Sequence, residues 1–271
     1  MATNLVNLSH AEMKSGISDG PAARLTWTSS CPEVYHGRPR RNRSPISGRK
    51  FMTHVPGTFF WFECGTSDAA MAKDFYTRLF GWDAVDVPMP GDTNGTYTLL
   101  QVDGADVAGL YELAGPQFEG VPSHWMTYVC VASADESAAR AEVLGATIVQ
   151  APMDVPGVGR LAFFADPTGA NIAVFQSGDH PGTDPGKTNL GWAELHTPDT
   201  EASRAFYTEL FDWNAKEDPS GEYTEWQVGG KSIGGMIAIP PEQLGTPSHW
   251  LIYALVAQCD ETLTKAAEMG A

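Results

Sequence analysis

The chain has 271 residues, of which 42% are hydrophobic, and a formal net charge of −16 at pH 7. No apolar run approaches the ~18 residues typical of a membrane-spanning helix, and the acidic character of residues 52–271 excludes nucleic acid and anionic membranes as expected partners. The four cysteines show no CxxC or metal-binding spacing and follow no secretory segment. We therefore expect reduced thiols in a cytoplasmic protein.

Residues 1–51 differ in charge from the remainder, with eight Lys and Arg residues against three acidic ones. A basic run such as that at residues 36–43 occurs in nucleic-acid-binding arms and in transit segments. The interpretation we favour is a leader upstream of the folded part, with Met52 as an alternative start. Residues 1–56 are accordingly predicted to be a disordered basic leader.

The remainder of the chain contains an internal repeat, at an offset of 131 that falls to 125 further along. Three pairs of similar segments define the repeat: residues 61–63 with 192–194, 75–82 with 206–213, and 122–125 with 247–250. A long, fixed period that preserves polar as well as apolar residues indicates a duplicated domain. We call residues 57–177 the first copy and residues 189–271 the second copy.

The first copy is predicted to contain two βαβββ units. Its strands are expected at about residues 58–65, 82–87, 96–102, 106–111, 124–131, 147–150, 159–165 and 171–176, from alternating apolar residues. Its helices are expected after the N-cap Asp68 or Ser67, and at about residues 135–144, where Gly145 ends the second one.

A linker rich in Gly, Pro and Asp is predicted at residues 178–188. The second copy, with Asp199 or Thr200 as N-cap, completes its first unit near Ile239, begins its second at His249 and ends with that unit's helix. We therefore predict an α+β fold of two tandem domains, the second C-terminally truncated. Such a truncation would expose an edge strand and the apolar surface beside it.

Several features together resemble a known family. They are the paired βαβββ units, the Phe-Tyr-x-x-Leu-Phe-Gly-Trp helix end at residues 75–82, Asp166-Pro167-x-Gly169 before the last strand, and the duplication itself. This combination resembles the vicinal oxygen chelate superfamily of glyoxalases, bleomycin-resistance proteins and extradiol dioxygenases. The Trp-x-Glu, Pro-Ser-His-Trp and Gly-Val-Gly-Arg phrases look like those of its tandem glyoxalase-like members from actinobacteria.

The resemblance implies a divalent metal as cofactor, bound by side chains of the first and last strands of both units. The corresponding positions hold Trp61, Met126 and Ala173 in the first copy and Trp192 in the second. None of these is a ligand for a hard or borderline metal. We expect the inherited metal site to be missing, which leaves the cofactor unknown.

Strand parity selects the candidate functional residues, because alternate residues share one face of a sheet. Glu63 and His124 are the candidate catalytic residues, as an acid/base pair on the cleft face. The candidate substrate-binding residues are Trp61, Tyr97, Tyr128, Glu194, His249 and Tyr253. The structural alternative, which is the more frequent role, is that the glutamates bond to loop backbone and that His124 and His249 bracket Pro-Ser turns.

Other residues are given structural roles. Trp125 and Trp250 face away from the cleft and are expected in the core, and Cys64 and Cys130 are expected to be buried thiols. The segment 157–160, Gly-Val-Gly-Arg, lacks the context of a phosphate loop. It is interpreted as a turn into a strand, with Arg160 paired or solvated.

Three functions remain open from the sequence. The first is a cytoplasmic glyoxalase-like lyase, isomerase or hydroxylase that acts on a small carbonyl or aromatic metabolite. The second is a metal-free protein that sequesters a small molecule, as bleomycin-resistance relatives do. The third is an inert paralogue whose surface binds a partner protein. A homo-oligomer is compatible with each of them.

Overall fold

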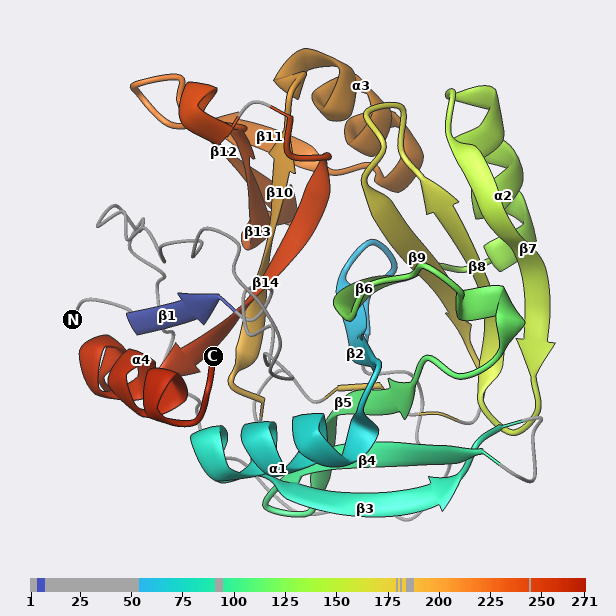
Figure 1. The fold of residues 1–271 in the computed structure, drawn as a ribbon. Coiled ribbons are helices and arrows are strands. Elements are labelled where there is room, and N and C mark those ends of the chain that lie inside the picture. Colours follow the sequence, from blue (N-terminus) through green and yellow to red (C-terminus); the bar gives the residue numbers. More distant parts are fainter. Residues whose placement is uncertain are drawn as a thin grey trace, which may run out of the picture.

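The computed structural model describes residues 4–7, 54–90, 95–178, 180, 182–183, 188–243 and 245–271. Within these residues the strands form two mixed sheets (Figure 1). Most of the segment predicted to be a disordered leader lies outside the described residues, but residues 4–7 form a strand. No helix in the described ranges is long and apolar enough to cross a membrane.

The first copy forms an eight-stranded sheet in the order β3-β4-β5-β2-β6-β9-β8-β7. Its elements are β2 (Phe59–Thr66), α1 (Ala69–Phe80), β3 (Asp83–Pro88), β4 (Thr96–Val102), β5 (Ala105–Glu112), η1 (Pro116–Phe118), β6 (His124–Cys130), α2 (Ala134–Val143), β7 (Thr147–Val155), β8 (Gly159–Ala165) and β9 (Asn171–Ser177). The two βαβββ units meet at β2 and β6, which pair antiparallel. The predicted fold class is confirmed.

The local signals in the sequence explain most element boundaries. Asp68 caps α1 by accepting a hydrogen bond of 2.8 Å from the Met71 amide, and Gly81 ends the helix with a φ of 71°. The clearest miss is β7, which was predicted to end near Gln150 and extends to Val155. Pairing with β8 continues past two register shifts, so the neighbouring strand overrides the local pattern there.

The second copy forms a six-stranded sheet in the order β1-β14-β10-β13-β12-β11. One strand of this sheet, β1 (Asn4–Asn7), comes from the segment before the first copy. The second copy contributes β10 (Leu190–Thr197), α3 (Thr200–Phe211), β11 (Asn214–Glu217), β12 (Tyr223–Val228), β13 (Lys231–Ala238), η2 (Pro241–Gln243), β14 (His249–Val256) and α4 (Cys259–Glu268). Here the expectation of an exposed edge strand is corrected. The strand β1 pairs antiparallel with residues 253–256 of β14 and covers that part of its edge.

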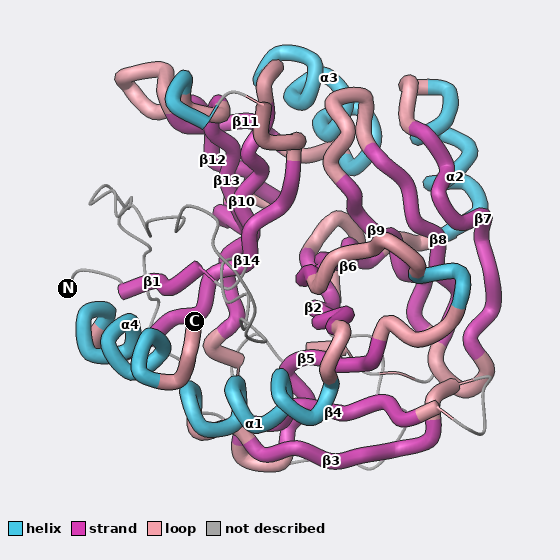
Figure 2. The backbone as a smooth tube through the Cα atoms, viewed as in Figure 1, coloured by secondary structure: helices cyan, strands magenta, loops and turns pink. Residues whose placement is uncertain are grey.

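The two copies pack against each other through their helices. Figure 2 shows α1 beside α4 and α2 beside α3, and both pairs are in contact. Two equivalent tryptophans, one in each copy, donate a hydrogen bond to the other copy. Trp82 Nε1 donates to Asn189 Oδ1 at 3.0 Å, and Trp213 Nε1 donates to the Gly57 carbonyl at 2.6 Å. Each copy is thus joined to the residue that leads into the first strand of the other.

The main hydrophobic core contains residues of both copies, including Trp125 and Trp250, so their predicted core role is confirmed. Cys64 and Cys130 are buried free thiols, also as predicted. A smaller cluster lies apart from this core, and its members are Phe60, Trp61, Tyr128, Cys130, Ala173 and Phe175. This smaller cluster borders the candidate site of the first copy.

Candidate functional site

In the first copy, Glu63 is the centre of a hydrogen-bond network. Its Oε1 accepts a hydrogen bond of 2.7 Å from the Tyr97 hydroxyl, and its Oε2 accepts one from the Tyr128 hydroxyl. Trp61 Nε1 in turn donates to the Tyr97 hydroxyl at 3.0 Å. The network joins β2, β4 and β6. Of the residues predicted to line the cleft with Glu63, Tyr97 and Tyr128 bond to its carboxyl group, and Trp61 bonds to Tyr97.

A glycine makes this network sterically possible. Gly109 of β5 lies between Glu63 of β2 and Leu99 of β4 in the sheet register. A Cβ atom at this position would lie 1.8 Å from the Tyr97 hydroxyl oxygen. Because Gly109 has no side chain, the Tyr97 ring can cross β5 and reach Glu63.

Burial decides the electrostatics of Glu63. Desolvation raises the pKa of its carboxyl group, and hydrogen bonds from Tyr128 and Tyr97 and the charge of His124 offset this only in part. Burial and the neighbouring carboxylate raise the pKa of Tyr97 and Tyr128 well above the usual value, so both phenols stay protonated and act as donors. Glu63 is therefore a buried carboxyl group whose proton affinity is increased.

His124 is placed beside this network and not within it. It begins β6, opposite Gly65, and its Nδ1 bonds to the Pro122 carbonyl at 2.9 Å. A carbonyl only accepts, so Nδ1 carries a proton and donates it to this hydrogen bond. The structure does not join His124 and Glu63 as a hydrogen-bonded pair. The Pro-Ser turn that was the structural alternative is present, and His249 makes the same bond to Pro247 at 2.7 Å.

The second copy repeats the network with the same geometry. Glu194 accepts hydrogen bonds of 2.8 Å from the hydroxyls of Tyr223 and Tyr253, and Trp192 Nε1 donates to Tyr223 at 3.0 Å. A Cβ atom on Gly235 would again lie 1.8 Å from the tyrosine oxygen. The whole Trp-Tyr-Glu-Tyr arrangement, with its glycine, is therefore part of what was duplicated.

One position distinguishes the two copies. His196 of β10 lies 2.9 Å from Glu194 through its Nε2, and its counterpart in the first copy is Gly65. Burial by itself would raise the pKa of Glu194, but hydrogen bonds from His196, Tyr223 and Tyr253 and the charge of His196 lower it overall. The equivalent position of the first copy leaves little room for a side chain, because a Cβ atom on Gly65 would lie 3.1 Å from the Tyr111 hydroxyl oxygen. The two carboxyl groups thus have opposite pKa shifts.

The positions that would bind a divalent metal do not provide suitable ligands. Trp61 and Ala173 flank Tyr128 in the sheet register, and Met126 lies opposite Glu63. The indole N–H of Trp61 donates a hydrogen bond to Tyr97 and does not provide a metal ligand, and the side chain of Ala173 has no atom that could bind a metal. Among the described residues no group of three or more His, Cys, Asp or Glu is arranged to hold a metal. These residues do not fit a hard divalent cation.

Sequence reasoning missed the two glycines of the networks, Gly109 and Gly235. The repeat contained their signal, because Gly109 returns as Gly235 at the offset that relates Tyr97 to Tyr223. Strand parity placed His196 on the same face as Glu194, and the repeat made Tyr223 the counterpart of Tyr97 in lining a pocket, but neither residue was among the candidate site residues.

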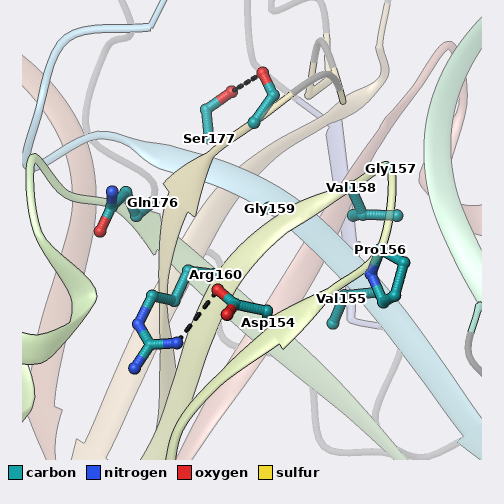
Figure 3. Close-up of a pocket in the computed structure, with 10 residues that line it drawn as sticks. Asp154, Val155, Pro156, Gly157, Val158, Gly159, Arg160, Gln176 and Ser177 are labelled. Carbon is teal, nitrogen blue, oxygen red and sulfur yellow. Dashed lines mark hydrogen bonds and ion pairs between the residues drawn. The ribbon is translucent and has the colours of Figure 1, made fainter.

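A separate hollow of about 380 Å³ lies at the end of the β7–β8 hairpin, bordered by residues 154–160 and 176–178 (Figure 3). Arg160 points toward Asp154 there, at 3.0 Å, and also bonds to Asp135 at 2.6 Å. Of the two alternatives expected for Arg160, paired or solvated, the structure shows the paired one. Because two carboxylates surround this guanidinium group, the hollow has no unpaired positive charge from Arg160 to attract an anion.

Comparison with known proteins is consistent with this geometry. The model of the Glyoxalase/Bleomycin resistance protein/Dioxygenase superfamily matches residues 58–174. The anthracycline biosynthesis protein DauV of Streptomyces sp. (strain C5) is 34% identical over 237 residues, which cover 80% of this chain and 83% of that protein. The "Putative glyoxylase CFP32" of Mycobacterium tuberculosis (strain CDC 1551 / Oshkosh) is 33% identical over 219 residues, covering 79% and 83%.

Solved structures share the fold at low sequence identity. A mutant of 4-hydroxymandelate synthase from Streptomyces coelicolor has a TM-score of 0.53 at 15% identity, covering 79% of this chain and 75% of that one. The Mn(II)-bound glyoxalase from Novosphingobium aromaticivorans has a TM-score of 0.51 at 15% identity, covering 79% and 70%. At this level of identity the similarity concerns the fold alone.

Proposed function

Given that the chain belongs to the Glyoxalase/Bleomycin resistance protein/Dioxygenase superfamily, we propose that it is an enzyme that transfers a proton within a small aromatic ketone or hydroxyketone. Glu63 is the base in this proposal. Tyr97 and Tyr128 orient its carboxylate, and His124 begins β6, the strand that bears Tyr128. No step in this reaction requires a metal at the positions of Trp61, Met126 and Ala173.

The observation that carries the proposal is the environment of Glu63. Its carboxyl group is buried, its pKa is raised, and its two hydrogen-bond partners are phenols that keep their protons. Among the described residues no Lys or Arg contributes to that pKa. A carboxyl group with increased proton affinity can remove a proton near neutral pH and return it.

The proton balance of the reaction is simple. Glu63 removes a proton from the carbon beside a carbonyl group, and the C–H electron pair forms an enolate. The resulting carboxylic acid then returns the proton to carbon or oxygen of the same molecule. No redox partner is needed, and the overall change is an isomerisation or a racemisation.

The surroundings of the network favour a planar, apolar ligand. Leu99, Met126, Leu161 and Phe163 are only partly buried and pack against the smaller hydrophobic cluster, which contains Trp61 and Tyr128. Such a face binds the body of an aromatic molecule, while one polar group fixes its orientation. The relation to a protein named for anthracycline biosynthesis supports an aromatic polyketide as the ligand class.

The test uses 1-tetralone, an aromatic ketone with exchangeable hydrogens beside its carbonyl group. Exchange of these hydrogens in D₂O is followed by NMR, with wild-type protein and with Glu63→Gln. We expect wild-type protein to accelerate exchange, and Glu63→Gln to lower the protein-catalysed rate by about 10²- to 10⁴-fold. Exchange by wild-type protein at the rate of buffer, or equal rates in both proteins, would refute the assignment of Glu63.

A metal-free binding protein is the second candidate, and one observation favours it. Both oxygens of Glu63 already accept hydrogen bonds within the protein, so the network is complete without a substrate. This function predicts that 1-tetralone quenches tryptophan fluorescence saturably while exchange stays at the buffer rate. Binding with exchange supports the enzyme, and binding without exchange supports the sequestering protein.

A further inference from the structure

We propose that the second copy contains an additional site, in which His196 is a general base oriented by Glu194 for a ligand with an acidic hydroxyl group, such as a phenol or an enol. This site is independent of Glu63, which lies in the other copy. The proposal rests on the geometry of one imidazole ring and on its difference from the first copy.

The His196–Glu194 contact fixes which nitrogen is available. Nε2 lies 2.9 Å from Glu194 Oε1, and this carboxyl group accepts hydrogen bonds from the hydroxyls of Tyr223 and Tyr253, so it is an acceptor and Nε2 carries a proton. When the ring carries only that proton, Nδ1 is its basic nitrogen. This is the arrangement of a histidine base with a carboxylate that sets its tautomer.

The basic nitrogen is buried without a partner. His196 Nδ1 has no hydrogen-bond partner among the described residues, although the side chain is only 12% exposed. Buried polar atoms of proteins are rarely left in this state, and each one that is requires an explanation. A hydroxyl group of a bound ligand would satisfy Nδ1.

The first copy shows that this histidine is not required by the scaffold. Glu63 is held by two tyrosines in the same way as Glu194, while Gly65 stands at the position of His196. The tyrosines alone therefore suffice to hold such a carboxylate. His196 adds a basic nitrogen that the structural network does not need.

The groups around the Glu194–His196 pair come from three strands. Glu194 shares its strand β10, Tyr223 reaches the same carboxylate from β12, and β14 contributes Tyr253 and His249. The ring of His249 lies 5.2 Å from that of His196, centroid to centroid. In the proposed step the O–H bond of the ligand breaks and an N–H bond forms at Nδ1. The ligand becomes an oxyanion, and the imidazolium is stabilised by Glu194.

The test uses 4-nitrophenol, whose visible absorption reports its ionisation. At a pH below the probe's own pKa, we expect wild-type protein to produce a saturable phenolate band. His196→Gly, which installs the residue of the first copy, should lower the apparent affinity at least tenfold, and added imidazole should restore the band. Glu194→Gln should weaken the band, whereas Glu225→Gln on β12 is the matched control that should leave it unchanged.

A measurement on the unaltered protein guards against misfolded variants. The ¹⁵N resonance of His196 Nδ1 should report an unprotonated nitrogen and should shift when 4-nitrophenol is added. A protonated Nδ1 in the free protein, an unshifted resonance at saturating probe, or an identical phenolate band in His196→Gly would overturn the proposal. Because Glu63 takes no part in these readouts, the result is separate from the 1-tetralone assay.

Discussion

Asp166 of the first copy accepts a hydrogen bond of 2.9 Å from the hydroxyl group of Tyr207 in the second copy, and both residues are buried. The other carboxylate oxygen of Asp166 accepts from Thr168 and from the Ala170 amide, within its own turn. Thr168 also lies 2.8 Å from Ser248, whose hydroxyl donates to the His196 carbonyl. A turn of the first copy is thus joined to the strand that bears the proposed second site.

We expect Tyr207→Phe to destabilise the protein more than the equivalent change in the first copy. The hydroxyl of Tyr76 accepts from Trp125 as that of Tyr207 accepts from Trp250, so both variants leave an indole unpaired. Only Tyr207→Phe also removes a donor from a buried carboxylate, which costs about 1–3 kcal/mol. Urea unfolding of both variants measures the difference. Equal losses would show that the Asp166 bond contributes nothing.

Gly109→Ala should disrupt the first network by steric overlap. The added methyl group would lie 1.8 Å from the Tyr97 oxygen, so the ring must leave Glu63, and overpacking of this kind costs about 1–3 kcal/mol. Gly191→Ala is the matched control, since a Cβ atom there meets nothing within 4 Å. Thermal unfolding of the two variants is the measurement. A Gly109→Ala protein as stable as Gly191→Ala would contradict the observed packing.

The two central glutamates should give opposite pH dependences of stability. The pKa of Glu63 is raised from 4.5, so the protonated form is favoured by folding, and its contribution is lost as the pH rises through the folded-state pKa. The pKa of Glu194 is lowered from 4.5, so its contribution is present above that value and is lost as the pH falls below it.

Urea unfolding across a pH series, with Glu63→Gln and Glu194→Gln, measures both effects. Relative to wild type, Glu63→Gln should become more stable as the pH rises above 4.5. The stability of wild type over Glu194→Gln should shrink as the pH falls below 4.5. When both differences are taken as the stability of the variant minus that of wild type, the Glu63→Gln slope should be positive and the Glu194→Gln slope negative, and slopes of the same sign would be incompatible with these environments.

Deletion of residues 1–7 should increase hydrogen exchange at the edge of β14. Residues 4–7 pair with residues 253–256, and an uncovered edge leaves its backbone amides accessible to water. Residues 128–130 of β6, which pair with β9, provide the internal control. Mass spectrometry of exchange should show faster exchange only in the β14 peptide. An unchanged rate there would mean that β1 does not protect this edge.

The sequence was sufficient for the elements and for the faces of the strands. Alternation of apolar residues placed β4 and β8 at their observed bounds, and the duplication identified which residues are equivalent. The alternation of side chains along a strand already placed Glu63 and Trp61 on one face of the sheet. These are local or periodic properties, and a single chain displays them directly.

The roles of individual site residues depended on contacts between distant strands. Tyr97 and Tyr128 are far from Glu63 in the chain, and strand register alone brings their hydroxyls to its carboxyl group. The unequal pKa shifts of Glu63 and Glu194 follow from burial and from one neighbour, His196, which strand parity placed on the face of Glu194 without predicting their hydrogen bond. The sequence by itself determined the repeated scaffold and which residues occupy the expected metal positions. The tertiary structure decided which groups are joined by hydrogen bonds and how their pKa values shift, because desolvation and hydrogen bonding exist only once the strands have paired.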